Sequence, residues 1–239
     1  MNLSKIGFVA MGLAATVLPI SSSAEILVKT GEKIGFLGDS ITQAGWEDSR
    51  GYVKLVISGL AANGVTVEPA PAGISGHKSN QMLARLESDV LSKKPQWMTL
   101  SCGVNDVWHG ANGVPIEAYK ENITKLVAQA TAASVKVVIL TATVIHEDPA
   151  SPENLRLAPY NDFLRSLAAE KGLKLADVNA LFQQEIKSLN KPDQKVLTSD
   201  GVHMNAEGNK LMAVGVLKAF GLGEDEMKKA QAAWAGAAK

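Results

Sequence analysis

The stretch Lys33-Ile34-Gly35-Phe36-Leu37-Gly38-Asp39-Ser40 joins a short apolar run to a glycine and two polar residues. A continuous apolar run that ends at a turn-forming residue predicts a buried strand, here residues 33–37. A strand that is apolar along its whole length is typical of a parallel sheet with helices on both faces. Asp39 and Ser40 then lie at the carboxyl end of the strand, where such sheets bind their ligands.

The same alternation of apolar runs and helically spaced segments continues along the chain. Further strands are predicted at residues 65–69, 97–101, 135–141 and 173–177, and helices at residues 52–62, 80–91, 115–133, 154–171 and 224–239. Parallel strands joined by right-handed helical crossovers form a small set of folds. The rhythm predicts a flavodoxin-like three-layer α/β/α sandwich with a five-stranded parallel sheet, in strand order 2-1-3-4-5.

Residues 1–24 have a composition of their own. Lys5 precedes an apolar run at residues 6–20, and the small residues Ser21-Ser22-Ser23-Ala24 follow. This layout is typical of a secretory signal peptide, and the run is short for a membrane anchor. We therefore expect a signal peptide at residues 1–24, one domain at residues 25–239, and a secreted or periplasmic protein with no stable membrane insertion after cleavage.

The overall composition excludes several classes of function. The 239 residues carry no formal net charge and only 5% aromatic side chains, so neither a basic face nor a stacking platform for nucleic acid is expected. Cys102 is the only cysteine, and the four histidines are scattered, which argues against a metal site. No Walker A or Gly-x-Gly-x-x-Gly motif is present, so no cofactor is expected.

Four clusters of small and polar residues follow strands or precede the last helices. They are Gly38-Asp39-Ser40-Ile41-Thr42, Gly73-Ile74-Ser75-Gly76, Gly103-Val104-Asn105-Asp106 and Asp200-Gly201-Val202-His203. A serine becomes a useful nucleophile when a histidine takes its proton and a carboxylate orients that histidine. Ser40, His203 and Asp200 supply these three groups. The backbone N–H of Ser40, an N–H of the second cluster and the Asn105 amide are candidate donors to an oxyanion.

Each cluster also has an ordinary interpretation. Ser40 or Asp39 could cap a helix, Asn105 and Asp106 could form a turn, and His203 could be an exposed loop residue. These roles explain the residues one at a time, but they do not explain why the clusters occur together in this order. Their joint occurrence favours catalysis.

The four clusters, in this order, resemble the sequence blocks of the SGNH (GDSL-like) hydrolase superfamily and span Gly38 to His203. The resemblance implies that Ser40 is the nucleophile, His203 the general base and Asp200 its orienting acid. It also implies an oxyanion hole formed by Ser40, Asn105 and a glycine of the second cluster, for which Gly76 is preferred and Gly73 is the alternative. The chain departs from the family in one place, because Ala-Pro-Ala precedes Gly73 where many relatives have an asparagine.

Within this superfamily, a secreted chain with few aromatic residues resembles the carbohydrate O-acetylesterases. The expected substrate is therefore a small-molecule or glycan ester that carries acetyl groups, with Asp39, Trp108 and His109 at the substrate rim. A lysophospholipase- or thioesterase-type GDSL lipase is the alternative within the family, and a non-catalytic carbohydrate-binding protein is the alternative outside enzymes. The sequence makes no prediction of the oligomeric state.

Overall fold

The computed structural model describes residues 25–191 and 194–236, so the expected signal peptide lies outside the described residues. Five parallel strands form one sheet in the order β2-β1-β3-β4-β5. The strands are β1 (Lys33–Gly38), β2 (Glu68–Gly73), β3 (Trp97–Ser101), β4 (Lys136–Leu140) and β5 (Lys174–Ala176). The predicted sandwich and its strand order are confirmed.

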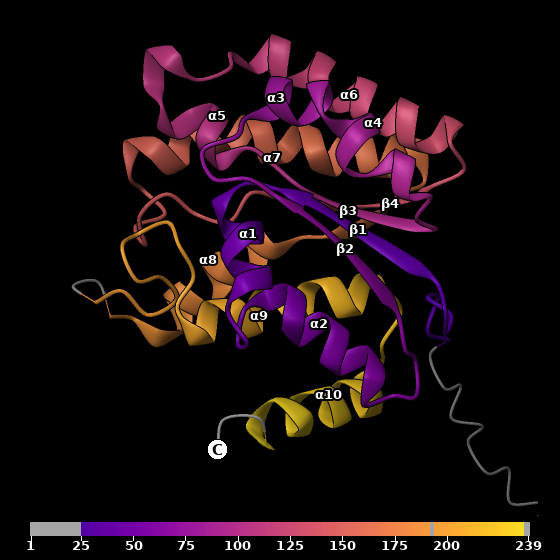
Figure 1. The fold of residues 1–239 in the computed structure, drawn as a ribbon. Helices are drawn as coiled ribbons and strands as arrows, with labels where there is room; N and C mark the ends of the chain where they lie inside the picture. Colours follow the sequence, from indigo (N-terminus) through magenta and orange to yellow (C-terminus); the bar gives the residue numbers. More distant parts are fainter. Residues whose placement is uncertain (1–24, 192–193, 237–239) are drawn as a thin grey trace, which may run out of the picture.

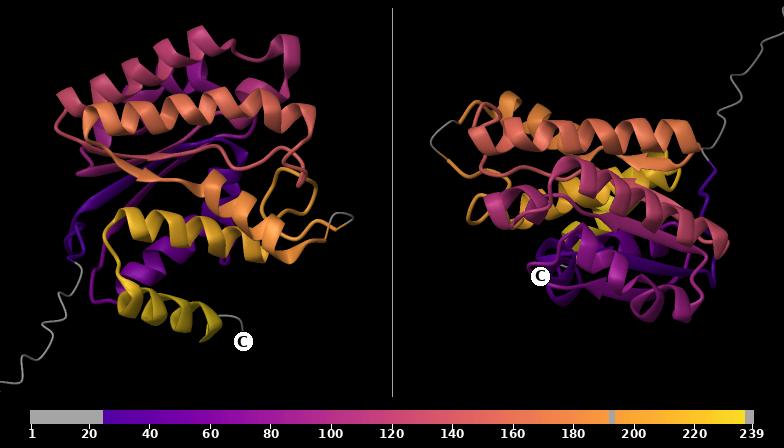
Figure 2. Two further views of the ribbon diagram at one scale, coloured as in Figure 1. Left: turned by 180° about the vertical axis from the view of Figure 1, so that it is seen from behind. Right: turned by 90° about the horizontal axis from the view of Figure 1, so that it is seen from above.

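Helices cover both faces of the sheet (Figures 1 and 2). One face carries α3 (Ser79–Ala84), α4 (Leu86–Asp89), α5 (Val104–Trp108), α6 (Ile116–Ala132) and α7 (Pro152–Lys171). The other carries α1 (Ser40–Glu47), α2 (Tyr52–Ala61), α8 (Val178–Leu189), α9 (Ala206–Ala219) and α10 (Glu224–Gly236). Two short 3₁₀ helices, η1 (Leu91–Lys93) and η2 (Gly110–Asn112), complete the described elements.

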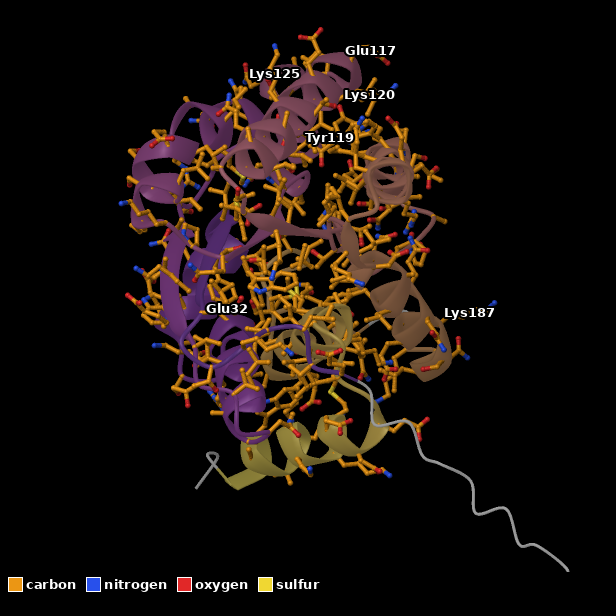
Figure 3. All side chains as sticks on the ribbon, turned by 90° about the vertical axis from the view of Figure 1, so that its right-hand side faces the viewer. Glu32, Glu117, Tyr119, Lys120, Lys125 and Lys187 are labelled. Atoms are coloured by element: carbon orange, nitrogen blue, oxygen red, sulfur yellow. The ribbon has the colours of Figure 1, made fainter. Side chains whose placement is uncertain are left out.

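The helices present apolar side chains to the sheet and charged side chains to solvent. Tyr119 of α6 is fully buried, whereas Glu117 and Lys120 form an ion pair of 2.8 Å on the outer face of the same helix (Figure 3). Burial on the sheet, more than intrinsic helix propensity, stabilises such helices. Within the described ranges, no helix combines the length and apolarity that a bilayer crossing needs.

Strand β2 begins three residues later than predicted. The apolar residues Val65 and Val67 suggested a strand at residues 65–69, but β2 spans Glu68–Gly73 and includes Pro69 and Pro71. Within the described part of the chain β2 pairs with β1 alone, so it is an edge strand, where proline is tolerated. The shift carries Gly73 to the end of the strand and places the second polar cluster directly after it.

The helix predicted at residues 80–91 is interrupted at Arg85. The backbone of Arg85 leaves helical geometry, with φ −109° and ψ 5°, and separates α3 from α4. Its buried guanidinium donates hydrogen bonds to the carbonyl oxygens of Gly38 (2.8 Å) and Ala72 (2.9 Å) and pairs with Asp89. Arg85 therefore joins the carboxyl ends of β1 and β2, where the polar clusters begin.

Candidate active site

The turn from β1 into α1 places the Ser40 side chain at the carboxyl end of the sheet. Asp39 is the N-cap of α1, and its Oδ1 accepts a hydrogen bond of 3.0 Å from the N–H of Ile41. Ser40 is the first residue of the helix, so its own N–H has no partner within the helix. Of the two residues considered as caps, Asp39 is the one that caps the helix.

Ser40, His203 and Asp200 form a continuous hydrogen-bonded chain. His203 Nε2 lies 2.9 Å from Ser40 Oγ, and His203 Nδ1 lies 2.6 Å from Asp200 Oδ2. An ionised aspartate can only accept, so Nδ1 carries the imidazole proton and Nε2 accepts from the serine hydroxyl. The spacing of three residues brings Asp200 and His203 onto the same turn, as the sequence predicts.

Asp200 is held in its ionised form. Partial desolvation raises the pKa of its carboxyl, but hydrogen bonds from the His203 side chain and from the N–H groups of His203 and Val202 outweigh this effect and lower the pKa to about 2. The carboxylate is therefore charged at neutral pH. A permanent negative charge beside Nδ1 orients the imidazole ring and stabilises the positive charge that forms when Nε2 takes the serine proton.

A depression of about 320 Å³ opens above Ser40. It is lined by residues from all four polar clusters and the segment after Asn105, namely Ser40, Ser75, Gly76, Asn105, Trp108, His109, Asp200, Val202 and His203. Trp108 and His109 thus lie where the substrate rim is expected. Trp108 is 42% exposed, and its ring stacks at a tilt on His146, with 5.3 Å between the ring centroids.

The two candidate glycines differ in position. Gly76 has φ +75°, a left-handed conformation that favours glycine, and it lines the depression with its N–H unpaired among the described residues. Gly73 lies against α1, and a Cβ added there would meet the backbone N of Gln43 at 2.3 Å. Gly73 is therefore a residue of close packing, and Gly76 faces the space above Ser40.

Asn105 projects from the start of α5 toward the same space. Its Nδ2 donates to the carbonyl oxygen of His77 at 3.2 Å and, through a long bond of 3.4 Å, to Asp39 Oδ2. The Asn105 side chain is thereby aligned beside Ser40 before any ligand binds.

The assignment of Asp39 to the substrate rim is wrong. The side chain turns inward to cap α1, the residue is only 3% exposed, and it does not line the depression. Burial raises the pKa of the Asp39 carboxyl to about 6, and the neighbouring carboxylate of Asp106 adds to the shift. Asp39 contributes to the structure beneath the site.

Asp106, for which the sequence suggests only a turn, is a second buried carboxylate and fixes α5 to α3. Asp106 accepts hydrogen bonds from the Ser79 N–H (3.0 Å) and hydroxyl (2.6 Å) and from the Cys102 thiol (3.4 Å). Desolvation raises the pKa of Asp106 despite these bonds. Cys102 is buried. The two neighbours therefore have different roles. The Asn105 side chain faces the site, and the Asp106 side chain anchors α5 to α3.

Among the described residues, no group of three or more histidine, cysteine, aspartate or glutamate side chains has a spacing that could hold a metal ion.

His77 packs against Arg85, which donates to its Nδ1 at 3.1 Å. Desolvation and the nearby guanidinium lower the pKa of His77. This histidine belongs to the framework of the site.

Comparison with known proteins agrees with the site's geometry. Residues 36–211 match the GDSL-like lipase/acylhydrolase family. An acetylxylan esterase from Geobacillus stearothermophilus is 27% identical over 213 residues, which cover 81% of this chain and 96% of that enzyme. Esterase TesA from Pseudomonas aeruginosa is 27% identical over 180 residues, 69% of this chain and 84% of the relative.

Solved structures give the same picture. The crystal structure of the acetyl xylan esterase AlAXEase superimposes with a TM-score of 0.74 at 33% sequence identity, covering 78% of this chain and 98% of that one. The family match spans most of the described residues and includes every polar cluster. The chain therefore belongs to the GDSL-like lipase/acylhydrolase family of the SGNH hydrolases, and it is a serine hydrolase of carboxylic esters.

Proposed function

We propose that this protein removes acetyl groups from acetylated carbohydrate through an acyl-enzyme on Ser40. The observation that carries the proposal is the hydrogen-bonded chain from Ser40 through His203 to Asp200 at the floor of a small, open depression. Similarity to two acetylxylan esterases, each matched over nearly its whole length, supports the choice of substrate.

The reaction begins when Ser40 Oγ attacks the carbonyl carbon of the acetyl ester and its proton moves to His203 Nε2. The tetrahedral intermediate then collapses as the bond to the sugar oxygen breaks, and His203 returns the proton to that oxygen. The products of this half are a free sugar hydroxyl and acetyl-Ser40. Water, deprotonated by His203, attacks the acetyl-enzyme, releases acetate and restores the serine.

Three donors surround the position of the oxyanion. The N–H groups of Ser40 and Gly76 have no acceptor among the described residues, and both residues line the depression. The third donor is Asn105, whose long bond to Asp39 is replaced by the bond to the substrate oxygen. Donors fixed in advance stabilise the charge that develops in the transition state, and removing one costs about 3 kcal/mol.

The size and lining of the depression favour a short acyl group on a sugar. A volume of about 320 Å³ is near the lower end of the range for small-molecule sites. Trp108, which is 42% exposed at its edge, offers a flat apolar surface beside the polar catalytic groups. Aromatic faces of this kind pack well against the apolar face of a sugar ring while leaving its hydroxyls in water.

The test compares p-nitrophenyl esters of increasing chain length with acetylated xylo-oligosaccharides, using the protein from Glu25 onward and its Ser40→Ala variant. We expect acetate release from the oligosaccharide, the highest kcat/KM on acetyl among the p-nitrophenyl esters, and loss of turnover in Ser40→Ala. Higher activity on octanoyl or palmitoyl than on acetyl would favour the lipase or thioesterase alternative. No turnover, together with no labelling of Ser40 by a fluorophosphonate, would support a non-catalytic binding protein.

We also infer that residues 1–24 direct the protein out of the cytoplasm. Lys5, the apolar run at 6–20 and the small residues before Glu25 support this inference. Expression of the full chain in a bacterium, followed by fractionation and mass measurement, should give a periplasmic or extracellular product that begins at Glu25. An intact chain in the cytoplasm would contradict it.

A further inference from the structure

A carboxylate outside the predicted site binds the segment that leads to Asp200 and His203. The loop after β4 carries Glu147, whose side chain accepts hydrogen bonds from three successive backbone N–H groups, those of Val196 (2.7 Å), Leu197 (3.0 Å) and Thr198 (2.6 Å). The Thr198 hydroxyl donates a fourth bond to the same carboxylate. Charge-assisted bonds of this kind are about twice as strong as neutral ones.

Bonds from the neighbouring residues extend this anchor to the catalytic turn. His146 donates its backbone N–H to the carbonyl oxygen of Gly201 at 2.7 Å, and Thr198 Oγ1 accepts from the Gly201 N–H at 3.1 Å. His146 adopts a positive φ of 62°, which is uncommon for a residue other than glycine. The dipeptide His146-Glu147 is thus hydrogen-bonded to residues 196–198, before the Asp200–His203 turn, and to Gly201 within it.

The loop that carries Glu147 is itself fixed from below. Asn154, a buried residue in the first turn of α7, accepts from the Ile145 N–H and donates to the carbonyl oxygens of Ile145 (2.8 Å), His146 (3.1 Å) and Asp148 (2.7 Å). The two amide hydrogens are shared among these three carbonyl oxygens, and together the bonds leave the loop little freedom. The anchor therefore connects the acid–base residues to a long helix of the core.

The acid–base residues need such support because little else packs around them. The side chains of His203 and Asp200 are 44% and 54% exposed. We propose that Glu147 is a positioning residue that holds the segment 196–203, here termed the acid–base loop, and thereby keeps His203 Nε2 within hydrogen-bond distance of Ser40. The proposal rests on the function proposed above. Displacing a catalytic group by about 1 Å can lower the rate about a hundredfold.

The test uses Glu147→Gln, Glu147→Ala and the control Glu153→Gln, a nearby carboxylate that pairs with Arg156 at the surface. The measurements are kcat and KM on p-nitrophenyl acetate, the melting temperature, and amide hydrogen exchange of residues 196–204. In Glu147→Gln the new NH₂ group faces backbone donors, so we expect kcat to fall about tenfold, and about a hundredfold in Glu147→Ala. KM should change less than about twofold, because the lining residues outside the acid–base loop, among them Gly76, Asn105 and Trp108, keep their positions.

Hydrogen exchange separates positioning from loss of the fold. We expect faster exchange confined to the acid–base loop in both Glu147 variants, with the strands still protected and Glu153→Gln like the wild type. Unchanged kcat with faster loop exchange would overturn the positioning role, as would unchanged exchange or a uniform loss of protection. If the wild type shows no Ser40-dependent hydrolysis, the proposed function fails, and the exchange data alone decide whether Glu147 holds the loop.

Discussion

The two halves of the active site are built in different ways. Ser40, Gly76 and Asn105 follow three adjacent strands, and beneath them lie the buried side chains of Arg85 and Asp106. Asp200 and His203 follow no strand. They lie on a half-exposed loop between α8 and α9, which the bonds to the loop after β4 hold in place.

The nucleophile and the base are therefore supported in different ways. The positions of the nucleophile and the oxyanion donors are fixed by the pairing register of β1, β2 and β3. This register cannot change without unfolding the core. The acid–base pair depends on a few hydrogen bonds at the surface, which can change alone. Substitutions under the first half should therefore lower global stability, and those around the second should lower activity at nearly constant stability.

Removing the nucleophile or the general base should abolish most of the activity. Ser40→Ala and His203→Ala should each lower kcat/KM on p-nitrophenyl acetate by about a thousandfold or more, and the double variant should lose no more than either single one. The reason is that the two side chains act only as a pair, across the 2.9 Å that separates them. If the fold loss in kcat/KM of the double variant equalled the product of the two single losses, the two side chains would act independently.

A large effect on stability is expected under the nucleophile half. Arg85→Met removes a charged donor from the buried carbonyl oxygens of Gly38 and Ala72, and a hydrogen bond to a charged group contributes about 1.5–3 kcal/mol. The free energy of unfolding, measured by urea titration, should fall by about 2–5 kcal/mol. The matched control Arg156→Met removes an exposed ion pair and should leave the urea midpoint nearly unchanged. Equal effects of the two variants would contradict the assignment of Arg85.

The free energy of unfolding should depend on pH through Asp39 in one half and through Asp200 in the other, with opposite signs. In the folded protein, burial raises the pKa of Asp39 from 3.8 to about 6, so its contribution to stability is present below pH 3.8 and is lost as the pH rises through 6. Asp39→Asn keeps an acceptor for the N–H of Ile41 and does not titrate. The stability of the wild type relative to this variant should therefore decrease by about 2 kcal/mol between pH 4 and pH 7.

Asp200 is expected to behave in the reverse manner. Hydrogen bonds hold its pKa near 2, despite some desolvation, so its contribution is present above pH 3.8 and is lost as the pH falls toward 2. The stability of the wild type relative to Asp200→Asn should decrease on acidification in the same urea titrations. If the stability of the wild type relative to each variant changed with pH in the same direction for Asp39→Asn and Asp200→Asn, the two halves would not differ in this respect.

The sequence predicted the half of the site that follows strands, because an apolar run, a glycine and a polar residue mark the end of a strand locally. It also predicted the Asp200–His203 pair, because the two residues are only three positions apart. It did not reveal Arg85, whose partners Gly38 and Ala72 lie 47 and 13 positions away, or Glu147, whose partners lie about 50 positions away. Asp39 was placed at the rim because the sequence does not show whether a helix cap turns inward.

Strand β2 exposes few backbone hydrogen-bond donors at the outer edge of the sheet. The N–H groups of Glu68 and Ile74 point to β1, so those of the odd-numbered residues between them point to the outer edge of the sheet. Two of these positions are Pro69 and Pro71, which have no N–H, and the third is Gly73, which α1 covers. An incoming chain therefore finds no row of donors with which to extend the sheet, which protects the enzyme against edge-to-edge aggregation.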